Sequence, residues 1–315
     1  MTKYRNALPQ LGDALFLTDG GIETTLIFHN GFELPYFAAF DLLRDGDGRS
    51  ALRSYYVPYA QLARERGVGF ILESPTWRAN ADWASKLGYT REELAEINRE
   101  AIALMVDLRN EFETARSPMV ISGCIGPRGD GYDPGRMMTA HEAETYHAEQ
   151  VAAFRDSDAD MVSAITMNYT EEAVGIARAT AAAEIPAVIS FTLETDGRLP
   201  TGQTLAEAIT VVDAASSPAP AYYMINCAHP THFDAILQTD APWTRRIKGL
   251  RANASKRSHS ELDAAPDLDD GDPAELGRLY RDLKEKIRSL TVLGGCCGTD
   301  HRHIHQICMA CTAAA

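Results

Sequence analysis

The feature that most constrains the fold is a regular alternation of short apolar runs with longer amphipathic stretches. Eight short runs, rich in β-branched and other apolar residues, recur along the chain, and each leads into a turn. They cover residues 15–17, 68–72, 119–121, 161–165, 187–193, 222–227, 246–250 and 291–293. Continuous apolar runs of this length are typical of strands that are buried on both faces of a parallel sheet.

Amphipathic segments with the helical period separate these runs. The clearest cover residues 91–112, 139–154, 171–183, 204–215 and 273–290. Residues with helix-capping side chains stand at the start of three of them, namely Thr90, Thr170 and Asp272. Strands that alternate with helices imply parallel pairing through right-handed crossovers.

The number of strand–helix units favours a closed barrel over an open sheet. Eight units in 315 residues fit an α/β fold with one (β/α)8 TIM barrel, in which residues 1–315 form a single domain. The alternative is a doubly wound sheet, which usually carries a G-x-G-x-x-G turn after its first strand. Here the first strand leads into Asp19-Gly20-Gly21, which lacks that spacing. Two segments, 125–136 and 253–272, are predicted to be long loops at the barrel rim.

Composition argues against several partners. The chain has 30 Lys and Arg residues against 44 Asp and Glu, and its net charge of −14 argues against binding to nucleic-acid phosphates. No apolar run approaches the roughly 20 residues of a membrane span. The first ten residues also lack the apolar core of a signal peptide. We therefore expect a cytoplasmic protein with no membrane partner, whose cysteines are reduced.

Three of the six cysteines lie at two of the predicted strand ends, where a barrel of this type builds its active site. Cys227 ends the sixth run, and Cys296 and Cys297 follow the eighth within Gly-Gly-Cys-Cys-Gly-Thr. The glycines allow a tight turn that directs both sulfurs toward one point. Three thiolates with an open fourth position form a catalytic type of zinc site, so we predict that these cysteines bind Zn²⁺. The alternative is that they are small buried hydrophobic residues.

The other three cysteines lack such a pattern. Cys124 also lies at a strand end, but its neighbours favour simple core packing. Cys308 and Cys311 have C-x2-C spacing on the last predicted helix, and a zinc site there would need a second pair. We assign no chemical role to these residues.

A zinc ion held by three thiolates suits one kind of reaction. Its negative charge makes it a poor Lewis acid for hydrolysis, but it can bind a fourth thiolate from a substrate. The ion lowers the pKa of that thiol and keeps it deprotonated at neutral pH. The pattern therefore favours alkyl transfer to a substrate sulfur.

Three motifs resemble those of the homocysteine S-methyltransferase family. They are Asp19-Gly20-Gly21, Asn226-Cys227 and the Gly-Gly-Cys-Cys-Gly-Thr segment at residues 294–299, and the resemblance extends from about residue 19 to residue 307. It implies a (β/α)8 barrel in which the three cysteines hold zinc and the sulfur of homocysteine takes the fourth position. It also implies that Asp19 and Gly20 contact the amino-acid end of homocysteine. We place Asn226 in the substrate site, where it orients the cysteine loop.

One departure from the family pattern concerns the ammonium group of the substrate. Many members end the fourth strand with a glutamate that meets this group, whereas Ile165 stands at that position here. A buried ammonium without a counter-charge is unfavourable. Glu73, at the end of the second strand, is the candidate replacement, with Ser74 and Thr76 beside it in the predicted substrate site. The alternative is that Glu73 only caps its turn.

A second departure concerns the methyl donor. Trp77 is suited to hold a methyl-onium group by a cation–π contact, but Arg78 follows it where betaine-using relatives have a tyrosine. Arg78 repels a bare cation and pairs with a donor that also carries a carboxylate, as betaine and S-methylmethionine do. We predict that Trp77 and Arg78 form the donor pocket. The alternatives are rim packing for Trp77 and a surface position for Arg78.

The sequence thus predicts a zinc-dependent methyltransferase of EC class 2.1.1. It would move a methyl group from a small-molecule onium donor, S-methylmethionine or a betaine, to homocysteine and give methionine. Two alternatives keep the zinc chemistry, namely another thiol or selenol acceptor and a role as the partner of a corrinoid system. A third is a structural zinc protein. No catalytic residue beyond the metal site is predicted, and the sequence indicates no oligomeric state.

Overall fold

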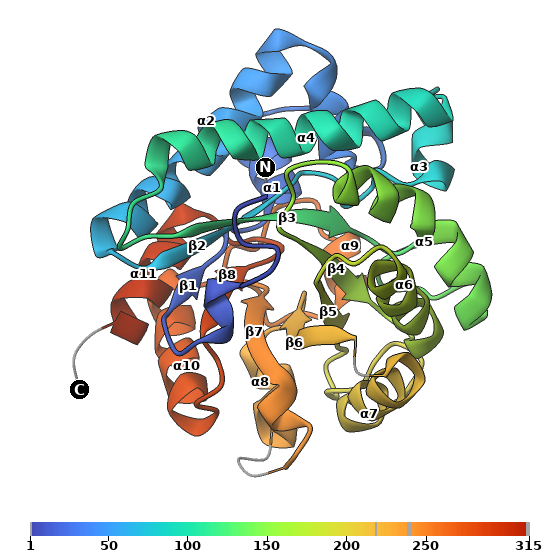
Figure 1. Cartoon of the computed structure of the whole chain (residues 1–315). Coiled ribbons are helices and arrows are strands. Elements are labelled where there is room, and N and C mark those ends of the chain that lie inside the picture. Colours follow the sequence, from blue (N-terminus) through green and yellow to red (C-terminus); the bar gives the residue numbers. More distant parts are fainter. Residues whose placement is uncertain (1, 218, 238–240, 313–315) are drawn as a thin grey trace.

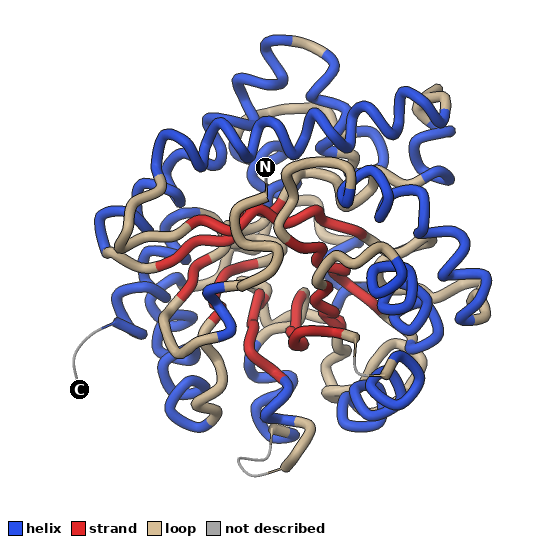
Figure 2. The backbone as a smooth tube through the Cα atoms, in the orientation of Figure 1, coloured by secondary structure: helices blue, strands red, loops and turns tan. Residues whose placement is uncertain are grey.

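The computed structural model describes residues 2–217, 219–237 and 241–312, and these form a closed barrel of eight parallel strands. The strands pair in chain order, and β8 closes the barrel by pairing with β1. Figure 1 shows the strands as a central ring with helices around it, and Figure 2 shows the same arrangement by element type. The predicted (β/α)8 barrel is confirmed, and the open-sheet alternative is wrong.

Each of the eight predicted runs forms a strand. The strands are β1 (Phe16–Leu17), β2 (Gly69–Glu73), β3 (Met119–Ile125), β4 (Met161–Met167), β5 (Ala187–Thr192), β6 (Pro220–Asn226), β7 (Ile247–Ala252) and β8 (Val292–Gly295). The main helices are α2 (Gly46–Arg66), α4 (Arg91–Phe112), α5 (Ala140–Arg155), α6 (Thr170–Ala182), α7 (Leu205–Ser216), α10 (Pro273–Lys286) and α11 (His301–Thr312). Shorter helices are α1 (Ile22–Thr24), α3 (Ala81–Lys86), α8 (Pro230–Phe233) and α9 (His259–Asp263), with a π-helical turn at η2 (Thr25–His29) and 3-10 turns at η1 (Pro9–Leu11), η3 (Pro35–Phe37), η4 (Ala39–Arg44), η5 (Asp234–Ile236) and η6 (Thr244–Arg246).

Two of the three predicted helix caps are confirmed. Thr90 forms a capping box with Glu93 at the start of α4, and the Asp272 carboxylate accepts from the amides of Ala274 and Glu275 in α10. The prediction for Thr170 is wrong, because this residue already belongs to α6 and its N-cap, Tyr169, makes no side-chain cap bond. A helix can therefore begin without a side-chain cap when its buried face supplies the stabilisation.

The long helix α2 was not among the strongest sequence patterns. It begins at Gly46 and carries Pro58 in its interior, and both residue types have low helix propensity. Burial of Leu52, Tyr55 and Tyr59 stabilises it against the rest of the molecule.

The barrel interior changes from apolar to polar along the strands. One buried apolar cluster fills the part of the interior nearer the N-terminal ends of the strands. It includes Phe16, Ile71, Val120, Met161, Val188, Tyr222, Met224 and Val292. Two residues farther along several of these strands lie the buried polar residues Glu73, Ser122, Ser163, Ser190 and Asn226. Because the interior of such a barrel is filled in layers, these polar residues form a layer that reaches the C-terminal strand ends at Glu73 and Asn226, with Cys124 and Ile165 beyond the serines of β3 and β4.

The N-terminal segment covers the opposite end of the barrel. Leu8 joins the interior cluster, and the Asp160 carboxylate, just before β4, accepts from the amides of Lys3 and Tyr4. Figure 1 shows this dark-blue segment crossing in front of the strands. Single-domain organisation over residues 1–315 stays a prediction, and residues 1 and 313–315 lie outside the described part of the chain.

Among the described residues, no helix combines the length and apolar character that crossing a membrane requires.

Candidate metal and substrate site

The three cysteines singled out in the sequence come together at the C-terminal end of the barrel. Cys227 follows β6 and Cys296 and Cys297 follow β8, and their sulfur atoms lie within 4.8 Å of one another. Cys227 is buried, whereas Cys296 and Cys297 are partly exposed. The cluster is therefore enclosed on the β6 side and open on the β8 side.

The cysteine cluster fits a zinc ion in its reduced state. A tetrahedral ion with Zn–S bonds of about 2.3 Å holds its sulfurs roughly 3.8 Å apart, a spacing within reach of this cluster. The structure joins Cys227 and Cys296 as a disulfide and leaves Cys297 free. Metal binding requires both paired sulfurs as thiolates, so the disulfide and a three-cysteine metal site are mutually exclusive.

Asn226 directly precedes Cys227, and its side chain is fully engaged in hydrogen bonds to neighbouring strands. Cys227 and Thr166 both have positive φ angles, 52° and 66°, which non-glycine residues adopt at an energetic cost. The Asn226 side chain accepts from the Thr166 amide at 2.9 Å and the Ser190 hydroxyl at 2.6 Å, and it donates to the Thr166 hydroxyl at 2.8 Å. These contacts tie the residue before Cys227 to β4 and β5, and the orienting role of Asn226 stays a prediction.

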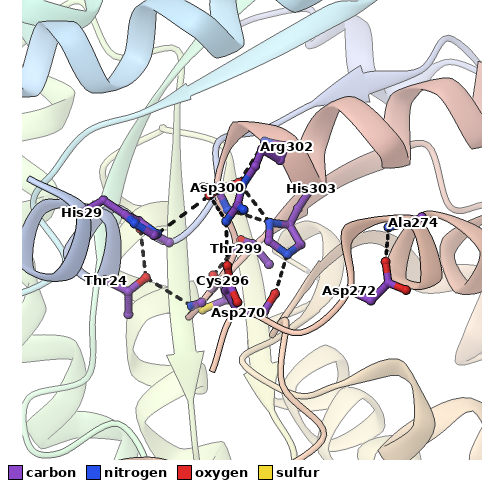
Figure 3. A network of polar contacts seen from close by, with 12 residues as sticks. Thr24, His29, Asp270, Asp272, Ala274, Cys296, Thr299, Asp300, Arg302 and His303 are labelled. Carbon is purple, nitrogen blue, oxygen red and sulfur yellow. Dashed lines mark hydrogen bonds and ion pairs between the residues drawn. The ribbon is translucent and has the colours of Figure 1, made fainter. Parts of the chain in front are cut away.

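The turn after β8 is held by its neighbours on both sides. Gly298 has a φ of 77°, and its amide donates to the Thr24 hydroxyl at 3.1 Å. The Thr299 hydroxyl donates to the carbonyl of Cys296 at 2.7 Å. On the other side, Asp300 pairs with His303 and Arg302 at the start of α11, as Figure 3 shows. The two cysteines of this turn are thus fixed between α1 and α11.

Asp19 is already paired in this structure. Its two carboxylate oxygens accept from Arg251 of β7 at 2.8 Å and from the Tyr55 hydroxyl at 2.9 Å. Burial raises the pKa of Asp19, and these two partners counteract the rise only in part. Gly20 follows directly, and a Cβ there would lie 2.7 Å from the main-chain oxygen of Thr299, so a side chain is excluded. The end of β1 therefore packs tightly against the cysteine turn.

Within the part of the chain that the structure describes, Glu73, unlike Asp19, is paired at only one of its two carboxylate oxygens. Its Oε1 accepts from the Ser163 hydroxyl of β4 at 2.8 Å, and its buried Oε2 has no hydrogen-bond partner among the described residues. Burial raises the pKa of this carboxyl to about 7, against the opposing influence of Arg251. Glu73 is thus a buried carboxyl with spare hydrogen-bonding capacity.

Ser74 and Thr76 hold the loop that follows Glu73. Their hydroxyls lie 2.7 Å apart, and Thr76 donates to the main-chain oxygen of Cys124 while Ser74 accepts from its amide. Both residues are buried. Cys124 itself packs in the barrel interior, beside Ile165.

Trp77 and Arg78 pack against the long rim loop between β3 and α5. The Trp77 indole donates to the Ile165 carbonyl at 3.2 Å, and the Arg78 guanidinium lies between the rings of Trp77 and Trp83. Arg78 is only 5% exposed and donates to the Gly129 carbonyl at 2.7 Å. The guanidinium therefore covers one face of Trp77, and the donor pocket stays a prediction.

Several residues near the site were not identified from the sequence. Arg251 lies within a strand, where no pattern marks a single charged residue as buried. Glu23 follows the Asp19 turn, and burial raises the pKa of its carboxyl to about 7. Tyr132 and His259 come from the two predicted rim loops, whose length was the available signal, although it did not indicate which residues face inward.

The chain is similar to known proteins over nearly its whole length. The family model described as homocysteine S-methyltransferase matches residues 16–311. Among solved structures, the oxidised form of the homocysteine methyltransferase MmuM from Escherichia coli has 20% identity and a TM-score of 0.73, with 97% of this chain and 99% of that chain covered. The metallated form has 19% identity and a TM-score of 0.72, with 96% and 98% covered. At this level of identity, the solved structures support the fold.

Proposed function

Since the chain belongs to the homocysteine S-methyltransferase family, we propose that it transfers a methyl group from a small onium donor to the sulfur of homocysteine at a zinc ion held by Cys227, Cys296 and Cys297. S-methylmethionine or a betaine is the proposed donor, and methionine is the product. The methyl carbon forms its new bond to the homocysteine sulfur as its bond to the onium atom breaks. The onium atom keeps that electron pair and leaves as a neutral group.

The observation that carries this proposal is the convergence of three sulfur atoms from two strand ends. When bound there, zinc would lower the pKa of the substrate thiol and hold it as a thiolate. Cys296 and Cys297 are partly exposed residues, which supports the approach of a fourth ligand from the β8 side. Burial raises the pKa of the free Cys297 thiol to about 11, so without a metal this group is protonated at neutral pH.

Glu73 is the proposed partner of the substrate ammonium group. Both oxygens of Asp19 are engaged by Arg251 and Tyr55, whereas Glu73 has a buried oxygen with no partner in the described part of the chain. Glu73 also reaches β4 through Ser163, two residues before Ile165. A bound ammonium would supply the missing hydrogen bond and favour the ionised form of the carboxyl.

The remaining predicted substrate residues are proposed to shape the pocket. Asp19 and Gly20 would contact the amino-acid end of homocysteine beside the Arg251 guanidinium, while Ser74, Thr76 and Asn226 hold the surrounding loops. Trp77 and Arg78 would lie on the donor side. Arg78 is held by the Gly129 carbonyl, and its buried Nε has no hydrogen-bond partner among the described residues.

The function is tested by an activity matrix of donors against acceptors, with reduced, zinc-loaded protein and mass spectrometry of the methylated product. We expect product with homocysteine and with S-methylmethionine or a betaine. Product only with another thiol or selenol would establish the alternative acceptor. Inactivity with all free donors, together with methyl transfer from a corrinoid protein, would establish the second alternative.

A cobalt titration separates an open catalytic site from a structural one. Cobalt in place of zinc gives absorption bands that depend on its ligands. At an open site, added homocysteine changes the spectrum because its sulfur joins the coordination sphere. A spectrum that homocysteine leaves unchanged would support a structural zinc protein instead.

The role of Glu73 is tested by comparing Glu73→Gln with Glu23→Gln. Both carboxyls have a pKa raised to about 7, but only Glu73 of the two has a buried oxygen that no described residue contacts by a hydrogen bond. Loss of a buried counter-charge weakens binding by about 2–5 kcal/mol, so we expect at least a 30-fold rise in the KM for homocysteine in Glu73→Gln. The KM for the donor should change little. An unchanged KM and turnover in Glu73→Gln would contradict the assignment, and a rise confined to Glu23→Gln would transfer it to Glu23.

A further inference from the structure

Two rim loops meet above the cysteine cluster through a pair of stacked rings. Tyr132 comes from the loop between β3 and α5, and His259 begins α9 in the loop between β7 and α10. Their ring centroids are 3.9 Å apart, with an angle of 20° between the planes. The predicted function uses neither residue, although both loops have unusual length for a barrel.

Each ring also contacts one of the cysteines proposed to bind the metal. The Tyr132 hydroxyl lies 3.6 Å from the sulfur of Cys297. On the other side of the stack, Nε2 of His259 lies 2.5 Å from the main-chain oxygen of Cys227. A carbonyl oxygen only accepts hydrogen bonds, so Nε2 is the donor, and this bond fixes the orientation of the imidazole ring. The other ring nitrogen, Nδ1, faces a Glu194 carboxylate oxygen at 3.2 Å.

The loop that carries Tyr132 is anchored by buried side chains. Arg78 donates to the carbonyl of Gly129, and Asn168 donates to the carbonyls of Asp130 and Gly131 at 2.9 and 3.1 Å. Buried donors that are used on loop carbonyls hold the loop in one conformation. Tyr132 is therefore presented to Cys297 by a rigid support.

We propose that Tyr132 and His259 are positioning residues that hold the ligands of the metal site in place. Tyr132 donates a hydrogen bond to the Cys297 thiolate, and His259 holds the backbone of Cys227. This inference rests on the proposed metal site. Contacts of this kind around metal ligands orient them and adjust how strongly they donate charge to the metal. Removal of the tyrosine hydroxyl should leave more electron density on the Cys297 sulfur and make its geometry less fixed.

The test compares Tyr132→Phe with wild-type protein, and Tyr89→Phe is the matched control because it removes a hydroxyl that bonds Asp41 instead. Each reduced protein is loaded with cobalt and its thiolate-to-cobalt charge-transfer band is recorded. Metal retention is then measured by competition with a chelator. Partners of metal ligands typically change metal affinity by about 10–100-fold, and we expect about tenfold weaker retention in Tyr132→Phe. The band should move to longer wavelength, because a thiolate without the hydrogen bond gives up charge more easily.

His259→Phe provides an independent variant, since it keeps an aromatic ring against Tyr132 and removes the bond to Cys227. We expect weaker metal retention here too. Unchanged band position and retention in Tyr132→Phe, with the variant folded by circular dichroism, would overturn the proposal, as would equal changes in Tyr89→Phe. Should Tyr132→Phe fail to fold, unchanged retention in His259→Phe would overturn it instead. Wild-type protein that binds no cobalt through its thiolates would instead refute the proposed function.

Discussion

The two ends of the barrel each bury a carboxylate, and they treat it in opposite ways. At the N-terminal end, Asp160 accepts from the amides of Lys3, Tyr4 and Ile121 and from the Arg109 guanidinium, at 2.8–3.0 Å. At the C-terminal end, Glu73 accepts from Ser163, and its second oxygen has no partner among the described residues. The carboxylate of Asp160 is thus saturated and that of Glu73 is left incomplete, although Asp19, near Glu73 at the C-terminal end, is paired with Arg251 and Tyr55.

This difference indicates which groups serve stability and which are available for a ligand. A buried polar group without a partner destabilises the fold unless something else compensates. The saturated Asp160 holds the N-terminal segment against the N-terminal end of the barrel. Glu73, in contrast, has the capacity that a bound ammonium group would fill. Variants of these residues test whether hydrogen-bond saturation, rather than burial, separates the structural Asp160 from the functional Glu73.

The largest effect is expected for the three cysteines. Cys227→Ala, Cys296→Ala and Cys297→Ala should each lose the zinc ion and reduce activity by more than about 10³-fold, because a metal contributes several kcal/mol to the transition state. Metal content is measured by mass spectrometry on reduced protein, and activity by methylated product. Cys311→Ala is the matched control and should keep both. A triple alanine variant with full activity would refute the scheme.

The next largest effect is expected at the N-terminal end of the barrel, where the hydrogen bonds of Asp160 are saturated. Asp160→Asn leaves the Arg109 charge buried without its partner and should lower the free energy of unfolding by about 3–5 kcal/mol. The KM for homocysteine of the folded protein should stay at the wild-type value, because Asp160 lies at the end of the barrel away from the cysteines. Urea unfolding and steady-state kinetics measure the two quantities. A stable variant with an altered KM would reverse the roles assigned to the two ends.

The sequence predicted the barrel well because hydrophobic periodicity is a local property. Each strand of the barrel overlaps one of the eight predicted runs, and α4 has the predicted bounds. The wrong or missing helix predictions arise where tertiary contacts override the local helix preferences of the sequence. Tyr169 and Thr170 show this at the start of α6, and Gly46 and Pro58 show it in α2.

The metal cluster was predictable because strand ends of a parallel barrel converge at one rim. The sequence could not predict that Arg251 would neutralise Asp19, since pairing across 232 positions depends on the closure of the barrel. Nor could it place Tyr132 over Cys297, because a loop that is rich in turns has many possible courses. The sequence thus marked the residues at strand ends but not their partners from other elements.

A smaller effect is expected in the pH dependence of stability. The pKa of Glu73 is raised from 4.5 to about 7 in the folded state, so the folded protein holds this proton more tightly than the unfolded chain. The resulting stability is fully present below about pH 4.5 and is lost as the pH rises through 7, a change of about 3 kcal/mol. Glu73→Gln should lack this contribution. Relative to the variant, the wild type should therefore lose stability between pH 5 and pH 8.

Urea unfolding of reduced, metal-free protein at the two pH values measures this difference, and Glu33→Gln, at an exposed position, is the control. Parallel stability changes in wild type and Glu73→Gln would mean that the carboxyl is ionised in the fold throughout. In that case an unobserved partner must saturate it, and the contrast with Asp160 would disappear.

The smallest expected effect tests whether a residue acts on the substrate because its hydrogen bonds are unsaturated or because of its position in the barrel. Thr90 caps α4 in the connection that follows β2, the strand that ends with Glu73, yet its hydroxyl and the Glu93 carboxylate satisfy each other's backbone amides. Thr90→Ala should lower the free energy of unfolding by about 1 kcal/mol, which for a chain of 315 residues lowers the Tm by about 1.5 °C. Thr90→Ser keeps the cap and should behave as wild type. Neither variant should change kcat or KM. A polar group whose hydrogen bonds are satisfied contributes to stability only, even when it lies in the loop that follows Glu73. A change in KM for Thr90→Ala without one for Thr90→Ser would show that position in the loop, and not saturation, decides which residues act on the substrate.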